Sequence, residues 1–185
     1  MDKLFDTWAN RNPEWEIKYE GLITQFCDYG RGASQYGAVR GKYFGAGYEM
    51  FIIAFFIGLY FNQEKPLTKD TSKKKPFGQP IKYWGNVESR GLRSSYPKIR
   101  RYLYAALIAR TDIDFIALDK GEMEVKKAVD KMMDKMEAYA NWGFDYMMEK
   151  VEENPNYFIP DGAFLKTFIQ FFNNTTEDDD PESLD

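Results

Sequence analysis

The chain has 185 residues, of which 44% are hydrophobic and 29% charged, a balance typical of a soluble globular domain with a core of its own. It contains no histidine and a single cysteine, Cys27, which excludes Ser-His-Asp and Cys-His catalysis, disulfide frameworks and thiolate zinc sites. The formal net charge of -4 is unevenly distributed, because residues 31–110 contain 15 basic and 4 acidic side chains, a net charge of +11, whereas residues 111–185 carry -12.

The first third of the chain predicts helices around an apolar centre. After a short amphipathic segment over residues 4–8, Pro13 is predicted to open a helix that ends at residues 30–32. This prediction depends on large apolar residues that recur every three or four positions, namely Trp15, Tyr19, Leu22 and Phe26. A glycine-rich loop over residues 31–47 leads into a helix over residues 48–62, which is apolar nearly all round and therefore predicted to be central.

The middle of the chain is less regular. Residues 63–94 combine lysines with prolines and predict a mobile basic loop. Ser95 and Pro97 then predict the start of a helix that runs to about Arg110. Thr111 and Asp114 have the spacing of a capping box, which predicts a short helix ending at residues 120–121.

A long amphipathic helix is predicted over residues 122–153, with Gly143 as a bend or a point of close packing. A last apolar helix is predicted to open at Pro160, and the acidic tail over residues 175–185 is predicted to be disordered. No alternating strand pattern is long enough to predict a sheet. The fold is therefore predicted to be all-α: one domain over residues 1–174, an irregular bundle of about six to seven helices around a central apolar helix.

Two features predict a cytoplasmic protein without a membrane anchor. The strongest apolar run covers residues 50–61, well short of the about 20 residues that a membrane span needs. The N-terminus lacks a basic region followed by an apolar run, so no secretory signal is expected.

The glycine-rich loop is the first candidate for chemistry. Its glycines are interleaved with Arg31, Arg40 and Lys42 and precede a helix N-terminus, where backbone N–H groups favour anions. The loop lacks both the P-loop ending Gly-Lys-Ser/Thr and the glycine spacing of dinucleotide-binding loops. Tight packing of the loop and contact with a nucleic-acid backbone remain the two alternatives.

A second basic region mixes cations with aromatic residues. The region covers residues 90–101, with Lys82-Tyr83-Trp84 before it and Tyr102 and Tyr104 after it. Its cations can neutralise phosphates while the neighbouring rings offer stacking platforms. On the predicted helix, Lys98, Arg101 and Tyr102 share an exposed face. The alternative is a solvated face, neutralised by the acidic C-terminal half. The residues predicted to bind nucleic acid are Arg31, Arg40, Lys42, Lys73, Lys74, Lys75, Lys82, Arg90, Arg93, Lys98, Arg100 and Arg101.

Acidic residues offer little beyond structure. Asp112, Asp114 and Asp119 lack the spacing and the glycine of a calcium loop, so helix capping explains them better. Glu49 lies in the first turn of the apolar helix and is expected, if buried, to pair with Arg31, Arg40 or Arg90. No metal site, cofactor or catalytic residue is predicted.

Residues 50–67 read MFIIAFFIGLYFNQEKPL, an apolar helix followed by Gly-Leu, a polar turn and Pro-Leu. This passage resembles the DndE-like proteins, small helical accessory proteins of DNA phosphorothioation systems. The resemblance implies a helical, DNA-associated protein and assigns no catalytic residue.

Three hypotheses follow for the function. The leading one is a non-catalytic accessory protein of a modification or restriction-type complex, which binds nucleic acid, DNA in preference to RNA, through the basic region. The alternative is a protein-interaction adaptor that binds a partner through its acidic C-terminal end and a methionine-rich helix (Met132, Met133, Met136, Met147 and Met148), or a homo-oligomer in which the acidic tail masks the basic region. A carboxylate-based enzyme is the weakest of the three.

Overall fold

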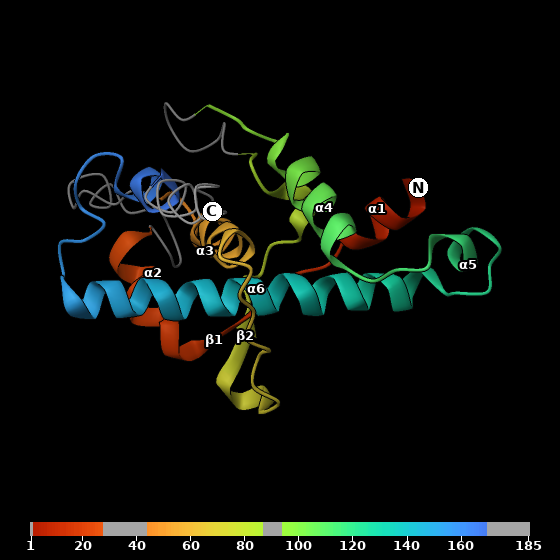
Figure 1. The fold of residues 1–185 in the computed structure, drawn as a ribbon, viewed down its shortest axis with the longest axis horizontal. Helices are drawn as coiled ribbons and strands as arrows, with labels where there is room; N and C mark the ends of the chain where they lie inside the picture. Colours follow the sequence, from red (N-terminus) through yellow and green to blue (C-terminus); the bar gives the residue numbers. More distant parts are fainter. Residues whose placement is uncertain (1, 28–43, 87–93, 170–185) are drawn as a thin grey trace, which may run out of the picture. The chain divides into compact units, whose positions relative to one another are not determined.

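A computed structural model describes residues 2–27, 44–86 and 94–169, and these are predominantly helical (Figure 1). The helical fold class predicted from the sequence is thereby confirmed. The chain divides into two compact units, Met1–Phe144 and Asp145–Asp185, which are described separately below. Among the described helices, none is both long and apolar enough to cross a membrane.

The N-terminal segment departs from its predicted helix. Helix α1 (Asp2–Ala9) is followed by strand β1 (Glu14–Glu16), the 3-10 turn η1 (Ile17–Tyr19) and helix α2 (Glu20–Phe26). A helix that opens at Pro13 is therefore wrong. Trp15 lies in β1 and is buried against Phe77, with the two rings 5.5 Å apart. Trp15 and Tyr19 therefore have the spacing of one helical turn although they do not lie on the same helix.

Helix α3 (Gly47–Tyr60) forms the centre of the first unit, as its composition predicts, and Met50, Phe51 and Phe55 are fully buried. It packs closely against the long helix α6 (Val125–Glu153). A Cβ added at Gly58 would run into the backbone of Tyr139, and one added at Gly143 would run into the backbone of Ala54. Close packing is therefore the role of Gly143.

The described part of residues 63–94 contains the 3-10 turns η3 (Thr71–Lys73) and η4 (Ile81–Tyr83) and strand β2 (Lys74–Pro76). Strand β2 pairs antiparallel with β1, with Lys74 opposite Glu16 and Lys75 opposite Trp15. The sequence does not predict this two-stranded sheet, because strands of three residues are too short to show a period of two.

Helix α4 (Ile99–Arg110) starts within two residues of its predicted position, and Leu103 and Leu107 are buried as expected. Helix α5 (Phe115–Asp119) begins differently from the prediction. Its N-cap is Asp114, whose carboxylate accepts a hydrogen bond from the backbone N–H of Ala117 at 2.9 Å. Thr111 is instead the residue that ends α4, so the predicted capping box is wrong.

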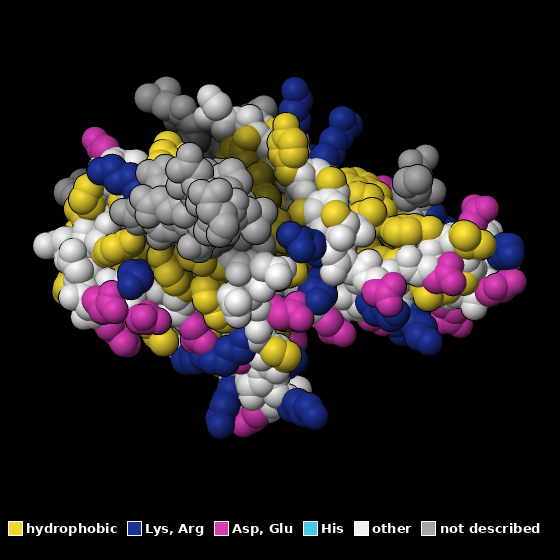
Figure 2. Space-filling model, in the orientation of Figure 1, with side chains coloured by type: hydrophobic (Ala, Val, Ile, Leu, Met, Phe, Trp, Pro, Cys, Tyr) yellow, Lys and Arg dark blue, Asp and Glu magenta, His cyan; other side chains and the backbone are white. Residues whose placement is uncertain are grey.

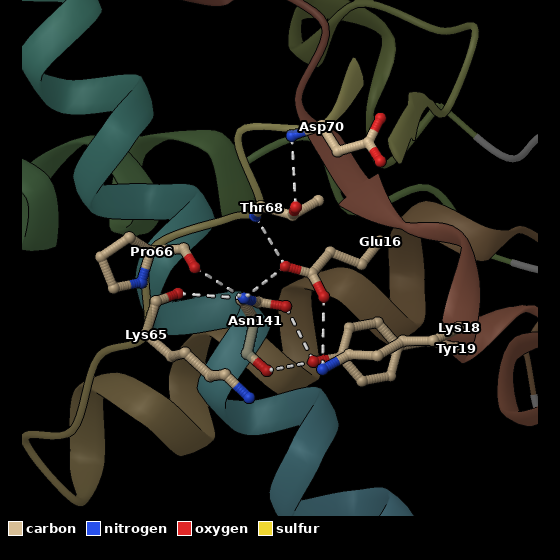
Figure 3. Close-up of polar contacts among 8 residues, drawn as sticks. All are labelled: Glu16, Lys18, Tyr19, Lys65, Pro66, Thr68, Asp70 and Asn141. Carbon is tan, nitrogen blue, oxygen red and sulfur yellow. Dashed lines mark hydrogen bonds and ion pairs between the residues drawn. The ribbon is translucent and has the colours of Figure 1, made fainter. Parts of the chain in front are cut away.

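A buried polar network joins four segments of the first unit around Asn141 of α6 (Figure 3). Its amide nitrogen donates to Glu16 Oε1 at 3.2 Å and to the carbonyl oxygens of residues 65 and 66. The hydroxyl of Tyr19 donates to Asn141 Oδ1 at 2.8 Å, and Glu16 Oε1 also accepts the N–H of Thr68. Asn141 thereby fixes β1, η1 and the segment after α3 onto α6.

The second unit begins inside α6 and contains a helical stretch over residues 163–169. Phe158 is buried and stacks on Phe164, with ring centroids 4.6 Å apart. Leu165 and Ile169 are exposed. The predicted acidic tail over residues 175–185 lies outside the described residues.

Candidate nucleic-acid interface

The predicted nucleic-acid-binding residues divide into three groups. Those at positions 31, 40, 42, 90 and 93 lie outside the described residues. Lys73, Lys74 and Lys75 lie in the η3–β2 segment. Lys82, Lys98, Arg100 and Arg101 lie in η4 and around the start of α4.

The lysines of the η3–β2 segment are paired with carboxylates. Lys74 Nζ lies 2.8 Å from Glu14 Oε2 and Lys75 Nζ 2.7 Å from Glu20 Oε1. Lys73 Nζ lies 3.5 Å from Asp70 Oδ2. The hydrogen bond that Lys74 donates to Glu14 raises the pKa of Lys74. Figure 2 shows the result at the lower edge of the view, where basic and acidic side chains alternate over this segment.

The start of α4 presents a different surface. Lys98 and Arg101 are exposed, Tyr102 is 63% exposed, and Leu103 turns inward, as the helical period predicts. Residues 95–111 contain no acidic side chain, and the first turn of α4 has no acid to balance the positive end of the helix dipole. In Figure 2, basic side chains project near the N-terminal end of α4 with no acidic side chain among the coloured atoms beside them.

Arg100 joins η4 to this end of α4. Its Nε donates to the carbonyl of Pro97 at 3.0 Å, and its terminal nitrogen donates to the carbonyl of Lys82. The N–H of Tyr96 donates to the carbonyl of Gly85 at 2.9 Å. The exposed ring of Tyr83, with Lys82 Nζ 5.0 Å from its centroid, is thus held beside the start of α4. We call Lys82, Tyr83, Lys98, Arg101 and Tyr102 the α4–η4 surface.

The cations of this region lack acidic partners among the described residues. No carboxylate of the described segments lies within 4.0 Å of the charged nitrogens of Lys82, Lys98, Arg100 or Arg101. The two described groups of predicted residues therefore differ, since one is neutralised by the fold and the other keeps its positive charge.

Glu49 lies behind this surface at the start of α3. It is buried, accepts the N–H of Gly45 at 2.7 Å, and accepts a hydrogen bond from the hydroxyl of Tyr96. Burial, followed by the contact with Glu49, raises the pKa of Tyr96, so that the phenol remains protonated. The arginines predicted to pair with Glu49 lie outside the described residues. Glu49 therefore helps to position Tyr96, which directly precedes the first turn of α4.

Sequence reasoning missed Glu137, a half-buried residue of α6. It accepts the N–H of Glu14 at 2.9 Å. Burial is the main cause that raises its pKa to about 7, and the nearby carboxylates of Glu14 and Asp134 act in the same direction. Its position next to the buried Met136 does not indicate that Glu137 is itself partly buried. That burial follows from its contact with β1, which is distant in the sequence.

Within the described segments, no group of three or more His, Cys, Asp or Glu side chains is placed to hold a metal ion. No family model, curated protein or solved structure matches the chain. The assignment of a function therefore depends on the geometry of the described residues.

Proposed function

We propose that this protein binds the phosphate backbone of nucleic acid, DNA in preference to RNA, through the α4–η4 surface. One observation carries the proposal: Lys82, Lys98 and Arg101 have no carboxylate partner among the described residues, whereas the lysines of the η3–β2 segment each have one. Unpaired cations at the positive end of a helix repel one another, and a phosphate group relieves that repulsion.

The chemistry of the surface fits a backbone contact. Lys98 and Arg101 are one turn apart on α4 and can contact adjacent phosphates, while Tyr83 and Tyr102 provide exposed rings for stacking. Contacts to phosphate give affinity and orientation without reading the base sequence. The proposal therefore predicts weak sequence preference, strong dependence on salt, and a cytoplasmic location where nucleic acid is accessible.

The test is fluorescence anisotropy with short duplex DNA, single-stranded DNA and RNA, each at low and near-physiological salt. The doubly reversed variant Lys98→Glu/Arg101→Glu is expected to bind more weakly and to reduce the slope of log K against log salt by about 2. The matched control is Lys126→Glu/Lys127→Glu, which changes the net charge equally at exposed α6 residues. Equal loss of binding in both variants would show a nonspecific charge effect, and unchanged binding in the first would refute the surface assignment.

A non-catalytic role in a DNA modification or restriction complex forms the second part of the proposal. It is supported by the resemblance of residues 50–67 to DndE-like proteins. Most of that passage lies in the buried helix α3, so it supports a related core rather than a shared surface. Bound duplex is expected to be recovered with its mass unchanged in mass spectrometry. A mass change or strand cleavage would contradict a non-catalytic role.

A protein-interaction role is the second candidate, and most of the predicted methionines are closed to it. Met132, Met133 and Met136 are buried and unavailable to a partner. Exposed apolar side chains among the described residues include Ile116 of α5 and Leu165 and Ile169 of the second unit. Light scattering after gel filtration is expected to give a mass above that of the monomer, which Leu165→Lys lowers if this residue lies in the contact. A monomeric mass at all concentrations would contradict self-association.

A further inference from the structure

A cavity of about 660 Å³ opens over α6, away from the residues of the α4–η4 surface. The segment after α3 (residues 64–69) and the end of α4 (residues 110–112) form its walls, and residues 131–138 of α6 form its floor. A neighbouring cavity of about 540 Å³ shares Lys74, Asp134 and Glu137 with it. Charged side chains of both signs line the larger cavity. Its two ends differ in the sign of the charges that have no oppositely charged partner.

The end beside α4 carries cations with neutral partners. Arg110 donates to the amide oxygen of Asn62 at 3.3 Å, and Lys131 donates to the backbone carbonyl of Asp112 at 3.1 Å. Among the described residues, no carboxylate lies within 4.0 Å of either cation, that of Asp112 included. Thr111 lines the same wall, and its buried hydroxyl has no hydrogen-bond partner among the described residues. Two positive charges are thus available to one anionic group.

The end beside the sheet carries an excess of carboxylates. Glu14, Asp134 and Glu137 surround Lys74, whose ammonium group is already 2.8 Å from Glu14. Asp134 is exposed and makes no ion pair with a described residue. In the neighbouring cavity, Arg11 already forms an ion pair with Asp130, with 2.5 Å between the guanidinium nitrogen and Oδ1. Asp134 and Glu137 are therefore available to a cationic group of a ligand.

We propose that this cavity binds a small organic molecule with an anionic group at one end and an amino group at the other. Arg110 and Lys131 would hold the anionic group, and Asp134 and Glu137 would hold the amino group. Lys131 and Glu137 are six residues apart on α6, which corresponds to about 9 Å along the helix axis. The two ligand groups must be separated by a chain of several carbon atoms, and an α-amino acid with a short side chain is too small.

The experiment is a titration of the full chain followed by ¹H–¹⁵N correlation spectra. The probe is 6-aminohexanoate, which carries both groups at this separation, and the controls are hexanoate and hexylamine. The probe is expected to shift the backbone amides of residues 110–112 and 134–138 and to bind about tenfold more tightly than either control. The absence of shifts, or equal binding by a control, would overturn the proposal.

Variants separate the two ends of the cavity. Lys131→Gln is expected to weaken binding of the probe by about tenfold, whereas the matched control Lys127→Gln, exposed on the same helix outside the cavity, leaves it unchanged. Equal effects of the two would overturn the assignment. The spectrum of each free variant confirms that it is folded.

The amino end has its own signature in the pH dependence. Because the pKa of Glu137 is about 7, its ionised fraction rises about tenfold between pH 6 and pH 8, and binding of the probe is expected to rise with it. Glu14, Lys74 and Asp134 are the other charged groups that face Glu137. Glu137→Gln is expected to abolish the dependence. An unaltered dependence in that variant would place the amino group elsewhere and overturn this part of the proposal.

Discussion

The close approach of α3 and α6 makes a definite prediction for Gly143→Ala. A Cβ at this position would lie 2.8 Å from the Cα of Ala54 and would also contact its carbonyl group. These are backbone atoms at the centre of a buried helix, and they cannot move aside as the end of a side chain can. The variant can therefore fold only if the two helices separate along their contact.

The expected magnitude combines two opposed effects. Overpacking a buried contact costs about 1–3 kcal/mol, and backbone atoms that must shift place this site at the upper end of that range. Alanine is favoured over glycine inside a helix by about 1 kcal/mol. The free energy of unfolding is therefore expected to fall by about 2 kcal/mol.

Urea unfolding followed by circular dichroism measures this change, and Gly21→Ala is the matched control. Gly21 lies in helix α2 with no atom within 4 Å of an added Cβ, so its replacement is expected to raise the free energy of unfolding by about 0.5–1 kcal/mol. Gly58→Ala should behave like Gly143→Ala, because it meets the backbone of Tyr139. A stabilised Gly143→Ala would refute the close approach of α3 and α6.

Other predictions concern buried polar groups and a helix cap. Asn141→Leu is expected to lower the free energy of unfolding by about 3 kcal/mol in urea titrations, because the carbonyl groups of residues 65 and 66 lose their donor inside the protein. The raised pKa of Glu137 gives stability that is present below the unfolded-state pKa of 4.5 and is lost as pH rises through about 7. Glu137→Gln should therefore be the more stable protein at pH 8, by up to about 3 kcal/mol, with little difference at pH 4.5. Asp114→Ala should lower stability by about 1 kcal/mol through loss of the cap on α5, and Asp114→Asn should restore most of it.

The long helices were predictable from the sequence because their patterns are local. Helix α3 is apolar nearly all round, and its bounds differ from the prediction by one or two residues. The stripe of α6 repeats over many turns, so that single exceptions do not hide its period. The exposed face of α4 was predictable for the same reason, since Lys98, Arg101 and Tyr102 follow from helical geometry once the helix is placed.

The remaining features depend on partners that are distant in the sequence. Strand β1 exists because β2 pairs with it, and Trp15 is buried by Phe77 rather than by its own neighbours. The charge on a lysine was equally hard to interpret, because Lys75 finds Glu20 across 55 residues of chain. A net charge of +11 over residues 31–110 is therefore correct as a sum and does not tell which cations remain available.

Removing the charge of a paired cation and of an unpaired cation should change the free energy of unfolding in opposite directions. Lys74 contacts Glu14 beside the paired strands, so Lys74→Gln is expected to lower the free energy of unfolding by about 0.5 kcal/mol. Lys98 and Arg101 have no described carboxylate partner and oppose the dipole of α4, so Lys98→Gln/Arg101→Gln is expected to raise it by about 0.5–1 kcal/mol. Urea unfolding at low salt measures both changes, and added salt should reduce them. A loss of stability in the double variant would mean that these cations stabilise the fold. We expect the double variant to be more stable and to bind DNA more weakly. This combination is typical of charges that bind a ligand and destabilise the folded protein.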